Sequence, residues 1–255
     1  MRNVMIPSNK GNIAAVVHEP TTKTGKLAIL CPGYLDSKDY THLVELAKML
    51  AGAGYTAVCF DPTGTWESGG SIGDYTTTQY LADIQTVIDY MLSQYDFENV
   101  LIGGHSRGGF MSMLSAARDP RISTVVSMMG STSGHIHTDE QKRIAWEHDG
   151  ISISKRDLPN NKDESREYRV PFSHQNDREQ YDVLSDLSKI HVPILFIAGE
   201  KDTLVTPKSV NSAYNLANEP KQYALMKDMG HDYRLNADEI AAVNARISKF
   251  LQNHP

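Results

Sequence analysis

The strongest constraint on the fold is the regular alternation of short apolar runs with segments of helical periodicity. The apolar runs cover residues 26–31, 55–61, 99–104, 122–129, 192–199 and 221–226. The helical patterns cover residues 41–54, 79–92, the segment after residue 106, a segment that opens at Pro207, and residues 237–251. Strands that are apolar throughout are typical of a parallel sheet with helices on both faces. The pattern therefore predicts an α/β fold with a mostly parallel central sheet.

Two segments depart from this alternation. Short runs near residues 3–6 and 13–17 predict an antiparallel hairpin at the edge of the sheet. Residues 130–190 are polar and highly charged, without a strong buried strand, and predict a cap or lid inserted after the sixth strand. No repeat or linker divides the chain, so we expect one domain, residues 1–255, that carries this insertion.

Large apolar side chains inside the insertion are expected to pack it onto the body. We expect one or two of them to line a pocket, and the sequence does not indicate which. They are Trp146, Tyr168, Phe172 and Tyr181.

Composition narrows the classes of partner and location. The formal net charge of −6 argues against nucleic acid or an anionic membrane as the main partner. The N-terminus has no apolar stretch typical of a signal peptide, and no run approaches the roughly 18 residues that span a membrane. We therefore expect a soluble, cytoplasmic protein, and the oligomeric state stays open. Cys31 and Cys59 end two apolar runs and are expected to be buried thiols without a disulfide.

The stretch "GHSRG" places Ser106 at a reversal between an apolar run and a helical segment. This matches G-x-S-x-G in the strand–turn–helix setting that the pattern requires. Gly104 and Gly108 would leave room where strand and helix nearly touch, and Ser106 would sit at a helix N-terminus that favours negative charge. We expect this tight turn to present Ser106 as a nucleophile. His105, inside the turn, is expected to point away from the substrate and to pack.

Two later loops offer partners for Ser106. Asp202 follows the apolar run 192–199, and His231 follows the run 221–226. Both loops would leave the same end of a parallel sheet as Ser106. A serine hydroxyl needs a base to remove its proton, and a carboxylate orients that base. We therefore predict a catalytic triad of Ser106, His231 and Asp202.

Because of these residues, the chain resembles the α/β-hydrolase superfamily. The resemblance extends from about residue 26 to the end. The matching motifs are "PGY", "GHSRG", "GEKDTLV" and "GHDY". The chain looks most like the small bacterial carboxylesterases that include the cinnamoyl and feruloyl esterases. The resemblance implies an oxyanion hole formed by the backbone N–H groups of Arg107 and Tyr34. Pro32 stands where the family often has histidine, and Trp66 stands where it often has glycine; we expect Trp66 to pack rather than face the pocket.

The expected substrate is a small-molecule carboxylic ester with a short-chain or aryl group. We expect hydrolysis through an acyl-enzyme, with neither cofactor nor metal. Three alternatives stay open: a peptidase or amidase, a carbon–carbon bond hydrolase, and a non-catalytic protein that binds a small ligand. A metal site at His135 and His137 is disfavoured, because no third ligand cluster has a recognised spacing.

Overall fold

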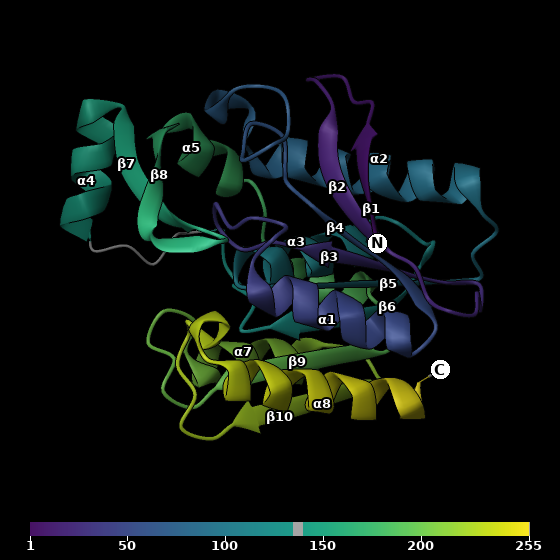
Figure 1. The fold of residues 1–255 in the computed structure, drawn as a ribbon. Helices are drawn as coiled ribbons and strands as arrows, with labels where there is room; N and C mark the ends of the chain where they lie inside the picture. The colour runs from purple at the N-terminus through teal and green to yellow at the C-terminus, as the bar shows by residue number, and fades with distance from the viewer. Residues whose placement is uncertain (135–139, 255) are drawn as a thin grey trace.

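An eight-stranded sheet forms the centre of the computed structural model, which describes residues 1–134 and 140–254 (Figure 1). Its spatial order is β1-β2-β4-β3-β5-β6-β9-β10. The strands are β1 Arg2–Ile6, β2 Ile13–His18, β3 Lys26–Cys31, β4 Tyr55–Phe60, β5 Asn99–His105, β6 Ile122–Met128, β9 Ile194–Gly199 and β10 Lys221–Met226.

The strand directions confirm the predicted mostly parallel sheet. Strands β4, β3, β5, β6, β9 and β10 pair in parallel, whereas β1 pairs antiparallel with β2 and β2 antiparallel with β4. The N-terminal hairpin therefore lies at one edge, as its short runs predict. Because the parallel strands point the same way, the loops that leave their carboxyl ends gather at one end of the sheet.

Helices cover both faces of the sheet and so bury its apolar strands (Figure 1). Helices α1 and α8 pack on one face, and α2, α3 and α7 pack on the other. Their bounds are α1 Thr41–Gly52, α2 Thr77–Gln94, α3 Arg107–Ala116, α7 Pro207–Leu216 and α8 Ala237–Asn253; two 3-10 turns are η1 Ile72–Asp74 and η3 Tyr233–Leu235. Helix α7 begins at Pro207, as expected, and the side chain of Thr206 caps it.

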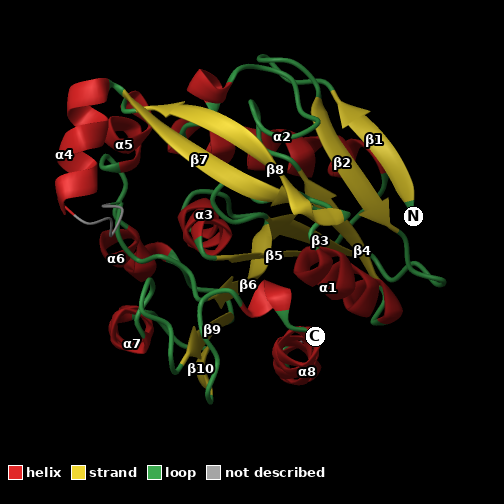
Figure 2. Ribbon diagram, turned by 60° about the vertical axis from the view of Figure 1, so that its left-hand side comes forward, coloured by secondary structure: helices red, strands yellow, loops and turns green. Residues whose placement is uncertain are grey.

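The segment between β6 and β9 contains a hairpin that the sequence analysis did not predict. Strands β7 and β8 pair antiparallel, and Figure 2 shows them as a long twisted ribbon beside the central sheet. Most of their side chains are exposed or half-buried, so they lack the continuous apolar run that marked the other strands. The described elements of the insertion are α4 Glu140–Asp149, β7 Ile151–Leu158, β8 Asn161–Pro171, α5 Ser173–Arg178, α6 Val183–Asp186 and the 3-10 turn η2 Leu187–Lys189.

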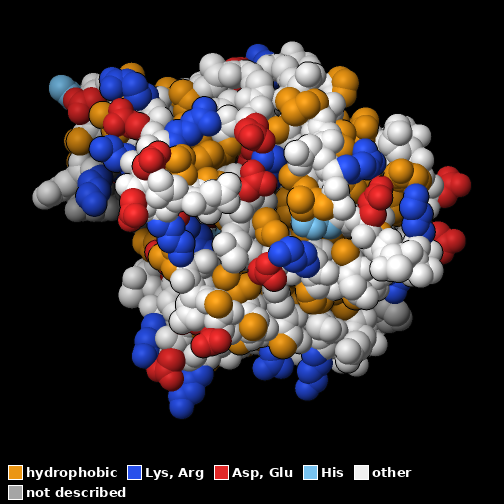
Figure 3. All heavy atoms as spheres, in the orientation of Figure 1, with side chains coloured by type: hydrophobic (Ala, Val, Ile, Leu, Met, Phe, Trp, Pro, Cys, Tyr) orange, Lys and Arg blue, Asp and Glu red, His pale blue; other side chains and the backbone are white. Residues whose placement is uncertain are grey.

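The hairpin is tied to the loops that follow β3 and β4. The hydroxyl of Tyr40 donates to the backbone oxygen of Asp157 (2.8 Å), and the backbone N–H of Trp66 donates to the hydroxyl of Tyr168 (3.0 Å). These contacts hold the insertion over the end of the sheet where Ser106 lies. On the face shown in Figure 3, the surface of the insertion carries Lys and Arg side chains interspersed with Asp and Glu. Across the described residues, no helix combines the length and apolar character needed to cross a membrane.

Candidate active site

Ser106 occupies the sharp turn between β5 and α3. Its backbone has φ 54° and ψ −114°, outside the regions that a non-glycine residue ordinarily adopts. The backbone N–H of Ser106 donates to the oxygen of Met128 on the neighbouring strand β6 (2.9 Å). Strain of this kind persists where surrounding contacts hold it, and it is characteristic of functional sites.

Two glycines allow the turn to close against strand β3. A Cβ at Gly104 would lie 2.5 Å from the backbone oxygen of Cys31, and a Cβ at Gly108 would overlap that same carbonyl group. The prediction that both glycines leave room therefore agrees with the geometry. The backbone they make room for includes that of β3, a neighbour that the local motif does not reveal.

The structure brings Ser106, His231 and Asp202 into one chain of hydrogen bonds. His231 Nε2 lies 2.9 Å from Ser106 Oγ, and His231 Nδ1 lies 2.7 Å from Asp202 Oδ2. Because a carboxylate only accepts, Nδ1 carries the proton and Nε2 is free to accept from the serine. Asp202 is buried, and its Oδ1 accepts from the backbone N–H groups of Leu204 (2.9 Å) and Val205 (2.8 Å). This arrangement can remove a proton from Ser106 and hold the resulting imidazolium.

His105 has a contact that sequence reasoning missed. Its Nε2 lies 3.0 Å from the backbone oxygen of His231, and because a carbonyl only accepts, Nε2 is the donor. The expected packing role is also present, since the His105 ring contacts Tyr233 edge-on. The residue before Ser106 thus fixes the loop that carries His231, a link between segments too distant in sequence for a local pattern to indicate.

The loop Pro32-Gly33-Tyr34 is held by aromatic side chains rather than by a histidine at position 32. Tyr80 donates its hydroxyl to the oxygen of Pro32 (2.9 Å), and the hydroxyl of Tyr75 accepts from the N–H of Leu35 (3.0 Å). Trp66 Nε1 donates to the oxygen of Leu35 (2.9 Å). These bonds anchor the loop without a side-chain hydrogen bond from position 32.

Two backbone N–H groups are available beside Ser106. Among the described residues, the N–H of Tyr34 has no hydrogen-bond acceptor. Arg107 is the first residue of α3, where an N–H has no acceptor within the helix. Both residues line the cavity that contains Ser106.

The cavity above Ser106 has a volume of about 350 Å³ and is bounded by the sheet end and the insertion. Its wall is rich in polar and charged side chains. The lining residues are Tyr34, Asp36, His105, Ser106, Arg107, Ser131, Lys142, Trp146, Ser152, Ser154, Arg156, Arg178, Leu204, Val205, His231, Asp232 and Arg234.

Only one of the four large side chains considered in the insertion lines this cavity. Trp146 does, and its Nε1 donates to the oxygen of Val170 (2.9 Å). Tyr168 packs edge-on against Trp66, Phe172 packs edge-on against Trp146, and Tyr181 lies outside the cavity. Trp66 is buried beneath the hairpin and does not line the cavity, as expected for a packing role.

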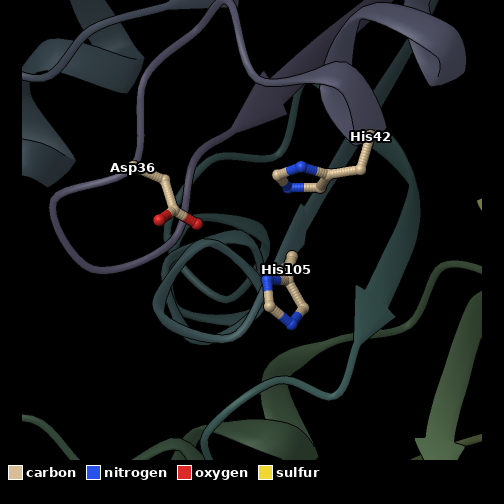
Figure 4. Close-up of side chains that lie close together, drawn as sticks. All are labelled: Asp36, His42 and His105. Atoms are coloured by element: carbon tan, nitrogen blue, oxygen red, sulfur yellow. The ribbon is translucent and has the colours of Figure 1, made fainter. Parts of the chain in front are cut away.

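Asp36, His42 and His105 form a buried group behind the turn (Figure 4). Their potential metal-ligand atoms all lie within 4.8 Å of one another. Burial, aided by nearby positive charge, lowers the pKa of His42 to about 3, and burial also lowers the pKa of His105 and raises that of Asp36. The group therefore favours neutral side chains. This cluster was not recognised in the sequence, while the weak candidates His135 and His137 lie outside the described residues.

Sequence comparison finds relatives among hydrolases. A family model described as the alpha/beta hydrolase fold matches residues 27–152. The palmitoyl-protein thioesterase ABHD10, mitochondrial, of Bos taurus is 21% identical over 211 residues, which cover 82% of this chain and 68% of the relative.

Solved structures share the architecture across nearly the whole chain. The ferulic acid-bound Est1E from Butyrivibrio proteoclasticus has a TM-score of 0.78 at 18% identity, covering 98% of both chains. The alpha/beta hydrolase domain-containing protein 10 from mouse has a TM-score of 0.79 at 17% identity, covering 100% of both. At this identity the likeness extends to the fold and no further.

Proposed function

This chain has the α/β-hydrolase fold, and on that premise we propose that it is a serine hydrolase that cleaves carboxylic esters. The observation that carries the proposal is the hydrogen-bonded chain Ser106–His231–Asp202 at the floor of a cavity. A non-catalytic protein that only binds a small ligand does not need a serine in a strained turn with a base and a buried carboxylate aligned behind it.

The reaction would proceed in two halves. Nε2 of His231 takes the proton of Ser106 as Oγ attacks the ester carbonyl carbon, and Asp202 stabilises the imidazolium. The N–H groups of Tyr34 and Arg107 would bind the oxyanion, and each such donor contributes about 2.7–4 kcal/mol to the transition state. The alcohol leaves with the proton from His231, and water then attacks the acyl-enzyme by the same path. No step calls for a cofactor or metal.

The size and polarity of the cavity favour small acyl or aryl groups. Its volume of about 350 Å³ lies near the lower end of the roughly 300–1,000 Å³ of ligand pockets. Relatives are named as thioesterases of palmitoylated proteins, and one similar structure contains ferulic acid. Because most of the lining side chains are polar or charged, we favour short or aryl esters over long acyl chains.

We infer that residues 1–255 act as one domain in which the insertion at about 130–190 is a lid. A cytoplasmic location also stays a prediction.

Turnover of 4-nitrophenyl esters from acetate to decanoate, beside methyl ferulate, tests the proposal. We expect hydrolysis that falls off with chain length and that drops by several orders of magnitude in Ser106→Ala, because the members of a triad act as a unit. Ser212→Ala is the matched control, since this exposed serine lies on α7 outside the cavity. Retention of more than about a tenth of turnover in Ser106→Ala would contradict the mechanism.

A further inference from the structure

Strand β7 turns its polar side chains inward. Ser152, Ser154 and Arg156 line the cavity, whereas Ile151 and Ile153 on the other face are 40% and 56% exposed. Alternate residues of a strand point to opposite faces, so a one-residue shift in register would bury the isoleucines instead. The roof of the cavity is therefore suited to a polar ligand rather than to a hydrocarbon chain.

Arg178, at the end of α5, is a buried cation that has no acidic partner among the described residues. The residue is only 5% exposed, and Nη2 donates to Ser131 Oγ (3.0 Å) and to the oxygen of Ser133 (3.3 Å). Among the described residues, its Nε has no hydrogen-bond partner and no carboxylate lies within ion-pair distance. Burial, together with the positive charge of Arg107, lowers the pKa of Arg178 to about 9. An anion beside Arg178 would offset both the cost of burying its charge and the repulsion from Arg107.

Arg107, which also lines the cavity, adds a second buried guanidinium whose charge acts on Arg178. Its guanidinium carbon lies 4.2 Å from the centre of the Tyr75 ring, and Nη1 donates to His174 Nε2 (2.8 Å). His174 Nδ1 donates to the oxygen of Tyr75 (2.7 Å), and burial keeps the pKa of His174 well below its ordinary value. Arg107 is thus held by a ring and a neutral imidazole, neither of which cancels its charge. Its Nε and Nη2 have no hydrogen-bond partner among the described residues.

Among the described residues, the lining of the cavity has more positive than negative side chains. Its basic lining residues are Arg107, Lys142, Arg156, Arg178 and Arg234, and its acidic ones are Asp36 and Asp232. Arg234 forms an ion pair at 2.9 Å with Asp157, which does not itself line the cavity. Among the described residues, Arg156 forms no such pair, and its buried Nε has no partner. This excess contrasts with the net charge of −6 for the whole chain. Buried charges are normally paired, so the unmatched guanidinium groups indicate a site for a negative ligand group.

We propose that the cavity selects esters that carry an ionised acid group, a carboxylate or a phosphate, bound by Arg178 and Arg107 beneath the polar face of β7. The inference rests on the proposed esterase function and specifies its substrate class. Guanidinium groups suit such anions because their planar N–H groups can donate two parallel hydrogen bonds. The charge would orient the substrate so that its ester carbonyl lies against Ser106.

Two matched substrate pairs test the proposal on the full-length protein. The first compares methyl hexanoate with monomethyl adipate, which carries the charge on the acyl side. The second compares 4-nitrophenyl butyrate with the butyrate ester of 5-hydroxy-2-nitrobenzoic acid, which carries it on the alcohol side. We expect kcat/KM to favour the anionic member of at least one pair by about 10-fold or more, as charge-assisted hydrogen bonds would give.

Variants connect that preference to the guanidinium groups. The anionic-to-neutral ratio of kcat/KM should fall toward 1 in Arg178→Met and recover in part in Arg178→Lys. Arg121→Met is the control, because Arg121 pairs with Asp119 and lies outside the cavity; its ratio should match the wild type. Thermal melting of each variant verifies folding. Inhibition of neutral-ester hydrolysis by adipate or by methyl phosphate, compared in the same variants, distinguishes a carboxylate from a phosphate site.

The outcomes separate this inference from the function on which it rests. Ser106-dependent turnover of neutral esters with no anionic preference in either pair would overturn the anion site and leave the esterase intact. A preference that survives unchanged in Arg178→Met would also overturn it. Absence of turnover on every ester would instead count against the proposed function. In that case, adipate or methyl phosphate could still raise the thermal stability of Ser106→Ala. If that increase were lost in Ser106→Ala/Arg178→Met, it would support the anion site on its own.

Discussion

The imidazole of His105 donates from Nε2 to the backbone oxygen of His231 over 3.0 Å. The side chain that precedes Ser106 thereby holds the loop whose own side chain faces Ser106 at 2.9 Å. The turn and the base are therefore positioned relative to each other by a direct bond as well as by the sheet.

Replacing His105 tests this positioning. In His105→Phe we expect kcat to fall by about 10-fold with little change in KM, since loss of one hydrogen bond costs about 1 kcal/mol and lets His231 drift. His105→Gln keeps a donor and should recover part of kcat. Steady-state kinetics on one short-chain ester measures both variants, and equal losses in the two would contradict a role for the donor.

Tyr75 is predicted to position, through its hydroxyl, the loop of residues 32–35 that carries the proposed oxyanion donor Tyr34. In Tyr75→Phe the buried N–H of Leu35 loses its acceptor, which should lower the free energy of unfolding by about 1–3 kcal/mol. The shift of the adjacent Tyr34 N–H should lower kcat by about 10-fold or more, because oxyanion donors act only in the correct place. Urea unfolding and ester kinetics measure the two effects.

Tyr95→Phe is the control for that substitution, because Tyr95 is half-buried and outside the cavity. It should match the wild type in kcat. A Tyr75→Phe enzyme with normal kcat would show that the loop keeps its place without this bond.

Gly108 is predicted to be the glycine of the turn least tolerant of substitution. In Gly108→Ala the new methyl group would overlap the carbonyl of Cys31, so we expect a loss of about 3 kcal/mol or more, or failure to fold. Gly52→Ala is the matched control, because no atom lies within 4 Å of its new Cβ; it should be neutral or stabilising by up to about 1 kcal/mol. Urea midpoints measure both, and similar midpoints for the two would contradict the steric account.

His42 should make stability depend on pH in the acid range. Burial lowers its pKa to about 3 in the folded chain, against about 6.5 in the unfolded chain. Between these values the unfolded state binds a proton that the folded state does not, so the free energy of unfolding decreases as pH falls below about 6.5. The slope from this residue approaches about 1.4 kcal/mol per pH unit.

His42→Phe should flatten that slope by about 1.4 kcal/mol per pH unit, the contribution of one proton. Both ring nitrogens of His42 are buried and have no hydrogen-bond partner among the described residues. The difference between variant and wild type isolates His42 from other titrating groups. His148→Gln, at an exposed residue, should leave the slope unchanged. Urea unfolding at intervals from pH 5 to 7.5 measures the slopes, and parallel curves for wild type and His42→Phe would contradict the assignment.

The sheet could be predicted from the sequence because its strands are buried on both faces. Strands β3 and β10 have the predicted bounds, and the other predicted strands of the sheet agree within two residues at each end. Hairpin β7–β8 could not be predicted by that signal, because its cavity-facing side chains are serines and an arginine while Ile153 faces outward. Apolar periodicity finds strands that bury hydrocarbon, and this strand does not.

The positions of Ser106, Asp202 and His231 could be predicted because each follows a strand of a parallel sheet. The bond from His105 to His231 and the anchoring of the Pro32 loop by Tyr75 could not, since each joins segments distant in the chain. The sequence also does not reveal that Arg178 lacks an acidic partner among the described residues, because it contains many acids that could have paired with it. Such features depend on packing, which local pattern does not specify.

The most direct test of the central claim is covalent labelling with a fluorophosphonate, followed by peptide mass spectrometry. The account predicts a single adduct on Ser106 Oγ, formed with loss of fluoride, absent in Ser106→Ala and much slower in His231→Ala because the base is missing. Labelling at another residue, or no labelling of a folded wild-type chain, would contradict the claim that Ser106 is an activated nucleophile.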